Sequence, residues 1–230
     1  SYNDPYYFAP AVEPYHELIT PWQKEFQQII GQNNATNFDH NQLLYFRNEE
    51  FDLLYPGFGD TYPIFNGAIG MTYEKGGSGA GGVAVKTSAT DTLTLKERLE
   101  HHYVTGLSTV EATYENSEKV IEQFQQFFKN ANSNPPGKYK TFIIAHENNT
   151  NIRNDLMDLL DINGITYGYL STSGSLSIDN AFNYTTGNTE TIEISNKDLC
   201  ISTQQDLAVL TYVLFEPVTH VSDSLTYDIT

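Results

Sequence analysis

The stretch Thr61–Gly82, TYPIFNGAIGMTYEKGGSGAGG, decides how we interpret the first half of this chain. From residue 68 to residue 74, large and small side chains alternate as in a β-strand with one face in a core. The large residues Ile69, Met71 and Tyr73 share one face, and the other face carries Ala68, Gly70, Thr72 and Glu74. Because glycine weakens a strand, the small face predicts close approach of a ligand or of another backbone. Glu74 stands over this face, either as a catalytic candidate or as an ordinary solvated acid at a strand end.

The composition supports a folded core and argues against some partners. Hydrophobic residues make up 39% of the 230 residues, enough for one large domain or two small ones. The net charge of −17, with only 12 Lys and Arg residues, argues against nucleic acid, whose phosphates need basic patches, and against an anionic membrane surface. No apolar run is long enough to span a membrane. The single cysteine, Cys200, permits no intramolecular disulfide, so a secreted location must be one where disulfides are optional.

Helix signals follow the first 20 residues, which are rich in proline and aromatic side chains. Thr20, with Gln23 three residues later, predicts a capped helix over residues 21–30 that is ended by Gly31. The Asn-rich residues after this glycine are predicted to form a loop. A short helical turn, capped by an asparagine, is predicted over residues 48–54.

A longer helical pattern begins after the glycine-rich stretch. Thr94 and Glu97 form a capping box. Side chains then recur at helical spacing: Leu95, Leu99, His102, Tyr103, Leu107, Val110, Tyr114, Ile121, Phe124 and Phe128. Because this pattern is long for one globular helix, Gly106 and a further capping box at Ser108–Glu111 predict a break near that point.

The clearest linker is Asn132–Gly137, and a domain boundary is predicted there. It separates residues 1–133 from residues 138–230, with 134–137 as the linker. In the second part a strand, a helix and a strand follow one another within about thirty residues, which implies a right-handed parallel unit of an α/β fold. We expect strands at 141–145, 165–170, 191–194 and 199–202, a helix at 152–162 that is ended by Asn163 and Gly164, a helix at 205–214, and a polar stretch before residue 191.

The histidines do not form a recognisable zinc site. A zinc hydrolase needs ligands at short spacing, such as H-x-x-E with a distant His. None of the six histidines is followed by Glu three residues later: His16, His40, His101, His102, His146 and His220. His101 and His102 would point about 100° apart on a helix, so they do not readily face one metal and are expected in the core or on the surface.

Two further chemistries are disfavoured by their local sequence. A nucleophilic cysteine sits on a tight turn after a strand, whereas Cys200 lies inside the strand-like Leu199–Ile201 and is expected to be a structural thiol. The loop GGSGAGG lacks the Lys-Ser/Thr that follows a phosphate-binding loop, so nucleotide binding is not predicted.

Several of these segments together resemble a known family. The runs Asp4–Pro10, Tyr55–Pro63 and Asn66–Glu74 resemble the later part of the catalytic domain of M14 family zinc carboxypeptidases, above all of large multidomain bacterial members. The helical segment Glu100–Glu111 also looks like theirs. The runs Val213–Pro217 and Asp223–Ile229 resemble the domain that follows, which in relatives is similar to class I glutamine amidotransferases. The likeness covers most of the chain.

The resemblance implies a fold and a set of site residues. The fold would be α/β: a partial zinc-carboxypeptidase-like mixed sheet with helices, then a smaller flavodoxin- or amidotransferase-like α/β domain. Glu74 matches by motif the general base that activates zinc-bound water. In the family a tyrosine on a mobile loop closes over the substrate; Tyr55 and Tyr62 both lie in the matching region, and Tyr55 is preferred for this role. Tyr62 and Asp60 are then expected to contact substrate.

The resemblance also places part of the site elsewhere. In relatives the zinc ligands, and the arginine that holds the substrate carboxylate, lie before the position of Ser1. We therefore expect zinc in a longer parent protein and none bound by this chain alone, which would be inactive by itself. The parent would be secreted or periplasmic, with its leader already removed, and would cut peptides near a free C-terminus. A sheet edge left exposed in the first part could support self-association.

Two other functions stay open from the sequence. The first is an inert binding or scaffold module that keeps the peptidase fold and recognises peptides or glycans with an acidic, tyrosine-rich surface. The second is an amidotransferase-like enzyme centred on residues 138–230, which the position of Cys200 disfavours.

Overall fold

A computed structural model describes residues 5–76, 82–88, 90–171 and 173–221. The chain mixes helices with small sheets and is of the general α/β class. It divides into two compact units: Ser1–Gln126 with His220–Thr230, and Phe127–Thr219. We describe each unit by itself. Among the described residues, no helix is long and apolar enough to cross a membrane.

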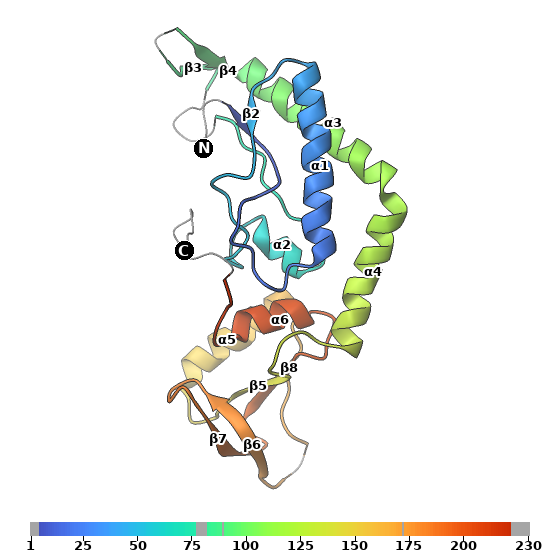
Figure 1. Cartoon of the computed structure of the whole chain (residues 1–230). Helices are drawn as coiled ribbons and strands as arrows, with labels where there is room; N and C mark the ends of the chain where they lie inside the picture. Colours follow the sequence, from blue (N-terminus) through green and yellow to red (C-terminus); the bar gives the residue numbers. More distant parts are fainter. Residues whose placement is uncertain (1–4, 77–81, 89, 172, 222–230) are drawn as a thin grey trace. The chain divides into compact units, whose positions relative to one another are not determined.

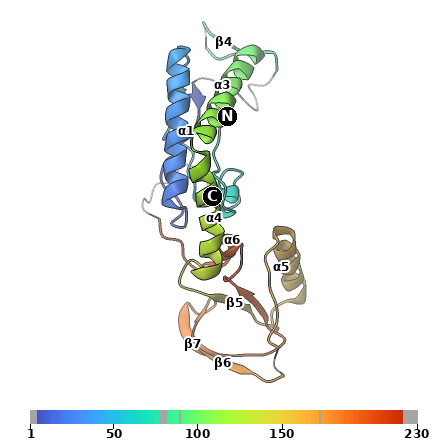
Figure 2. The same ribbon diagram turned by 90° about the vertical axis from the view of Figure 1, so that its right-hand side faces the viewer.

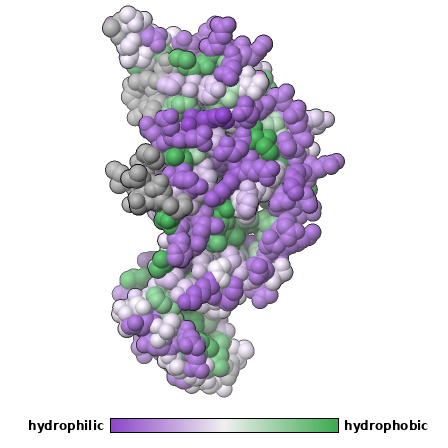
Figure 3. All heavy atoms as spheres, viewed as in Figure 1, coloured by the Kyte–Doolittle hydropathy of each residue, from purple (hydrophilic) through white to green (hydrophobic). Residues whose placement is uncertain are grey.

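The first unit is built mainly on two long helices and short strands (Figure 1). Its helices α1 and α3 lie side by side in both views (Figure 1 and Figure 2). The elements are β1 Tyr6–Tyr7, α1 Pro21–His40, β2 Tyr45–Phe46, α2 Thr61–Phe65, β3 Ala84–Lys86, β4 Thr92–Thr94, α3 Leu95–Glu115 and α4 Ser117–Ser133. The last of them, α4, continues into the second unit. Hydrophilic residues cover most of the face drawn in Figure 3, in line with the net charge of −17.

The segment Tyr6–Phe8 is the central strand of the first unit. Its consecutive backbone N–H groups point to alternate sides: Tyr6 donates to Leu44 O at 3.2 Å, Tyr7 to Glu74 O at 2.9 Å, and Phe8 to Phe46 O at 3.4 Å. All three side chains are buried. The aromatic residues near the start of the chain therefore lie at the centre of a core.

Helix α1 starts where predicted but does not end at Gly31. The capping box of Thr20 and Gln23 is present, and the helix runs on to His40, so the predicted stop and the predicted loop after it are wrong. Gly31 serves a packing role instead: a Cβ at this position would lie 2.3 Å from the carbonyl oxygen of Ala9. The glycine is needed for close approach of the Ala9–Pro10 backbone rather than for a helix end.

The helical turn predicted over residues 48–54 is also wrong. Asn48 has a left-handed φ of 58° and donates its backbone N–H to Pro10 O at 2.9 Å. Leu53 instead forms a parallel bridge with Tyr15. Pairing with the N-terminal segment thus overrides the local capping signal.

Helix α3 is continuous through Gly106, so the predicted break there is wrong. The capping box of Thr94 and Glu97 is present as expected. Ser108 does not cap a second helix; its Oγ lies inward, where Asn33 Nδ2 donates to it at 3.0 Å. The helix ends at Glu115 instead, with Asn116 as its C-cap, and α4 begins at Ser117.

The second unit contains the remaining elements and the end of α4: β5 Thr141–Ile144, α5 Thr150–Asn163, β6 Leu176–Asn183, β7 Asn188–Ile194, β8 Leu199–Ser202 and α6 Ala208–Phe215. Helix α5 ends at Gly164 in the left-handed conformation, as predicted. The predicted linker 134–137 lies within this unit, where the Tyr212 hydroxyl accepts the backbone N–H of Lys138 at 3.1 Å.

The order of strands in the second unit differs from the predicted parallel unit. Strand β5 pairs antiparallel with β8, and Gly168 bridges the other edge of β8, also antiparallel. Cys200 therefore lies between Ile143 and Gly168. The predicted strand 165–170 is wrong, because this segment forms only the bridge at Gly168. It runs in the same direction as β5 but is separated from it by β8, because the last strand inserts between them.

A β-hairpin was not predicted in the polar stretch before residue 191. Strands β6 and β7 pair antiparallel there, with a register shift between Ile178 and Ala181. Most of the side chains of this hairpin are exposed. Without an apolar face, its sequence lacks the alternation by which strands are recognised.

Candidate functional site

Glu74 ends the extended segment 68–74 and is fixed through its backbone. Its N–H donates to Tyr7 O at 3.0 Å, and its carbonyl accepts from Tyr7 N at 2.9 Å, in an antiparallel bridge. Residues that face each other in such a pair project their side chains to the same side of a sheet. The Glu74 side chain, which is half-buried, therefore lies on the Tyr7 side.

The opposite face of segment 68–74 packs into the core. Ile69, Met71 and Tyr73 contact a buried cluster that includes Phe26 and Ile30 of α1. The hydroxyl of Tyr73 also lies 2.5 Å from Thr109 Oγ1 on α3. The predicted alternation is confirmed, although the segment forms only one bridge and is not a strand over its length.

Two glutamines of α1 take the place of a neighbouring strand along this segment. Gln23 Nε2 donates to Ile64 O at 2.9 Å and to Ala68 O at 2.8 Å, and Gln27 Nε2 donates to Gly70 O at 2.9 Å. Both glutamine side chains are buried. They satisfy carbonyl groups that would otherwise need a strand partner. The sequence does not predict this role for the two glutamines. Gln23 already has an explanation in the capping box with Thr20.

The small face predicted around Gly70 accommodates another backbone. A Cβ at Gly70 would lie 1.7 Å from the carbonyl oxygen of Asp60, so only glycine fits. Two residues later, Thr72 Oγ1 donates to Asp60 Oδ2 at 2.7 Å. The Asp60 carboxylate is thus held beside the segment that ends at Glu74. The pKa of Tyr7 is raised, mainly by burial and also by the nearby charges of Tyr15 and Asp60.

Arg98 of α3 fixes the chain directly after Glu74. Its Nη1 donates to Gly76 O at 2.9 Å, and its Nη2 donates to Gly82 O. Gly76 has a positive φ of 56°, and a Cβ there would meet Leu93 and Arg98 side chains. The residues between these two glycines lie outside the described residues, as does most of the glycine-rich loop. The sequence analysis did not single out Arg98, because an arginine is an ordinary residue in a helix and leaves the helical pattern of α3 unchanged.

The two tyrosines expected near substrate lie on the surface of the first unit. Tyr55 is 48% exposed and packs edge-on against Phe58 at 5.2 Å, in the turn that precedes α2. Tyr62 is 40% exposed and lies in the first turn of α2. Both rings are partly exposed, and Asp60 lies two residues before Tyr62.

The adjacent histidines of α3 both contact Tyr6. The Tyr6 hydroxyl lies 2.6 Å from His102 Nδ1 and 3.0 Å from Thr105 Oγ1, while the His101 ring is edge-on to Tyr6 at 6.0 Å. Burial raises the pKa of Tyr6 and lowers the pKa of His102. The short contact between the Tyr6 hydroxyl and His102 Nδ1 ties the central strand to α3.

In the second unit, Asp198 organises a hydrogen-bond cluster. Its carboxylate accepts the backbone N–H and Nδ1 of His146 at 2.7 and 2.8 Å, and the N–H and Oγ of Ser195 at 2.6 and 2.9 Å. Burial alone would raise the pKa of Asp198, but these bonds hold it well below its ordinary value. Burial and Asp198 raise the pKa of the half-buried Cys200 thiol, which is a poor setting for a nucleophile.

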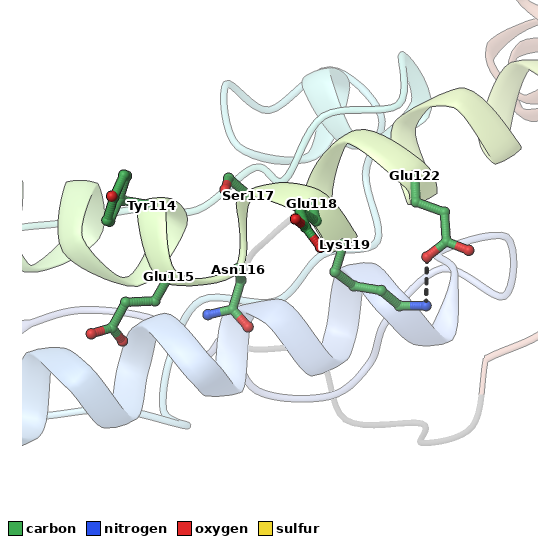
Figure 4. A pocket seen from close by; sticks show the side chains of 7 residues that line it. All are labelled: Tyr114, Glu115, Asn116, Ser117, Glu118, Lys119 and Glu122. Atoms are coloured by element: carbon green, nitrogen blue, oxygen red, sulfur yellow. Dashed lines mark hydrogen bonds and ion pairs between the residues drawn. The ribbon is translucent and has the colours of Figure 1, made fainter.

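No group of three or more His, Cys, Asp or Glu side chains that could hold a metal ion comes together in the part of the chain that is described. A hollow of about 770 Å³ lies where α3 meets α4, with Tyr114 and Glu118 in its lining (Figure 4). Lys119 and Glu122 pair there at 3.1 Å. The hollow is open and acidic, and it lies on different elements from Glu74.

Comparison with protein-family models, with curated proteins and with solved structures gives no match to this chain.

Proposed function

We propose that this chain is the Glu74-bearing part of a zinc carboxypeptidase of the M14 type, which hydrolyses peptide bonds near a free C-terminus. The observation that supports it best is the setting of Glu74: a half-buried residue at the end of a segment with one small-residue face, fixed through its backbone by Tyr7 and two residues after Thr72, which binds Asp60. The first unit would then be a partial zinc-carboxypeptidase-like sheet with helices. The second would be a flavodoxin- or amidotransferase-like accessory domain.

In this proposal Glu74 is the general base. It takes a proton from the water that attacks the peptide carbonyl and then passes it to the leaving amine. Such a base must be held within hydrogen-bond reach of the water, and the two backbone hydrogen bonds to Tyr7 fix the position of its main chain. Tyr55, Tyr62 and Asp60 would contact the peptide from the neighbouring turn and α2.

The metal is not assigned to residues of this chain. The described residues offer no group of three ligands, so by themselves they do not fit the zinc that the resemblance implies. The ligands would belong to a longer parent protein, which we propose is secreted or periplasmic. Cell fractionation with an antibody to this chain tests that location.

The test of the enzyme proposal is Glu74→Gln in the full protein that contains this chain. Loss of the base is expected to lower kcat for an N-blocked dipeptide with a free C-terminus by about 10²- to 10⁴-fold. The matched control is Glu17→Gln, an exposed glutamate of the same unit, which should leave kcat unchanged.

A protein that binds no zinc and cleaves no such peptide would contradict the enzyme proposal. The alternative would then be a binding or scaffold module, which the exposed rings of Tyr55 and Tyr62 favour. Its expected result is saturable binding of uncleaved peptide that is weakened by Tyr55→Ala.

A further inference from the structure

Helix α3 turns its small and polar face inward and its large apolar face outward. The inner row, buried against the first unit, consists of Arg98, His101, Thr105, Ser108 and Ala112. The outer stripe, 54–80% exposed, consists of Leu99, Tyr103, Leu107, Val110 and Tyr114. With about 100° of rotation per residue, the two rows lie on opposite sides of the helix. An ordinary surface helix has the reverse arrangement.

Three members of the inner row form hydrogen bonds within the first unit: Arg98, Thr105 and Ser108. Asn33 of α1 donates to Ser108 O and Oγ, Thr105 lies against Tyr6, and Arg98 binds two glycine carbonyls. These contacts set the rotation of α3 about its axis. The helix cannot turn its apolar side chains inward without breaking them.

The outer stripe has the form of a helix-binding surface. Its members are spaced three or four residues apart, which is the spacing by which one helix packs on another. At its N-terminal end it opens into a groove of about 770 Å³, where Val83 and Leu95 add apolar surface beside Leu99 and Tyr103. Contiguous exposed apolar surface of this kind marks an interaction site.

The charges along the stripe select the partner. One edge carries Glu97, Glu100, Glu111 and Glu115 on exposed positions, against the single ammonium of Lys96, which pairs with Glu100 at 3.4 Å. Hydrogen bonds from Thr94 lower the pKa of Glu97, so this carboxylate is ionised. A second copy of the chain would bring its own net charge of −17, and antiparallel pairing would set the acidic edges against each other.

We propose that the outer stripe of α3 binds an amphipathic α-helix of another protein, whose apolar face covers the stripe and whose Lys or Arg side chains lie along the acidic edge. In Figure 4, Tyr114 projects from the side of α3 opposite α1, in the direction from which the partner helix approaches. This inference does not depend on the enzyme proposal.

The experiment uses the 230-residue chain and two labelled leucine-rich helical peptides of roughly 18 residues, about five turns. They share one apolar face and carry Lys or Glu along one edge. Fluorescence anisotropy is expected to show saturable 1:1 binding of the Lys peptide and at least about tenfold weaker binding of the Glu peptide. Equal binding of the two peptides would overturn the assignment of a basic partner.

Variants locate the binding. Leu107→Ser with Val110→Ser should weaken the Lys peptide by about tenfold or more, because central apolar contacts dominate such interfaces. The matched control is Ile152→Ser with Ile162→Ser, two exposed apolar residues of α5 in the other unit. Circular dichroism checks that each variant is folded. Unchanged binding to the stripe variant would overturn the proposal.

A second pair separates specific charge recognition from general attraction to an acidic protein. Glu100→Gln with Glu111→Gln should weaken the Lys peptide more than Glu17→Gln with Glu25→Gln, which removes the same charge elsewhere on the first unit. Equal effects of the two pairs would overturn the proposal. Analytical ultracentrifugation provides a further check. A dimer of the chain that is dissociated by Leu107→Ser with Val110→Ser would also overturn the proposal, because the stripe would then bind a second copy.

Discussion

Glu74 in the first unit and Asp198 in the second are carboxylates at the ends of extended segments, and the protein holds them in different ways. Asp198 is 4% exposed, and its carboxylate accepts four hydrogen bonds from His146 and Ser195. Glu74 is half-buried, and its position is fixed through its backbone by Tyr7. The side chain of Asp198 is therefore a structural element, whereas the bonds between Glu74 and Tyr7 fix the backbone of Glu74.

The strongest test of this comparison is the backbone packing behind Glu74. Gly70→Ala should lower the free energy of unfolding of the first unit by about 3 kcal/mol, because the new Cβ would lie 1.7 Å from Asp60 O and the segment must shift. Urea unfolding followed by far-UV circular dichroism measures the loss.

The control for Gly70→Ala is Gly106→Ala in α3, where no atom lies within 4 Å of the added Cβ. Alanine there should raise the free energy of unfolding by up to about 1 kcal/mol, since glycine is a poor helix former. Equal effects of the two substitutions would show that the segment before Glu74 is not packed as described.

The second test addresses the structural carboxylate. Asp198→Asn should lower the free energy of unfolding of the second unit by about 2 kcal/mol, because charge-assisted bonds from Ser195 and His146 are weakened and one donor loses its acceptor. The matched control is Asp155→Asn, an exposed residue of α5 that should change stability little. A change in the free energy of unfolding as small as that of Asp155→Asn would show that the Asp198 side chain is not a structural element.

The smallest expected effect is on pH dependence. Because the pKa of Asp198 is lowered in the folded protein, the unfolded chain binds more protons than the folded one as pH falls through about 4. The stabilisation from Asp198 is therefore complete above about pH 5 and is lost as pH falls toward the folded pKa. Denaturant unfolding at a series of pH values should show a shallower acid loss for Asp198→Asn than for the unchanged chain. Parallel curves would contradict the lowered pKa.

Signals that act within a few residues predicted the structure well. The capping boxes at Thr20 and Thr94, the stop at Gly164 and the alternation that packs Met71 against a buried cluster are all present. Each depends on backbone preferences or on one face of one element, so neighbouring residues contain the information.

Features set by distant partners could not be predicted. Gly31 reads as a helix stop until the approach of Ala9 is known, and β8 takes a place between two segments that precede it. The candidate site divides in the same way. The motif singles out Glu74, but the arrangement of Tyr7, Arg98 and the buried glutamines around it comes from residues far away in sequence.

The contacts of Tyr6 have a consequence for the order in which the chain folds. Its hydroxyl binds His102 and Thr105, which follow it by 96 and 99 residues. On a ribosome that adds roughly 5–20 residues per second, the central strand must wait several seconds for these partners. The partners of Tyr6–Phe8 at residues 44–46 are made earlier, so the contacts to α3 are the late ones, and the first unit completes its core in a late step dominated by long-range contacts.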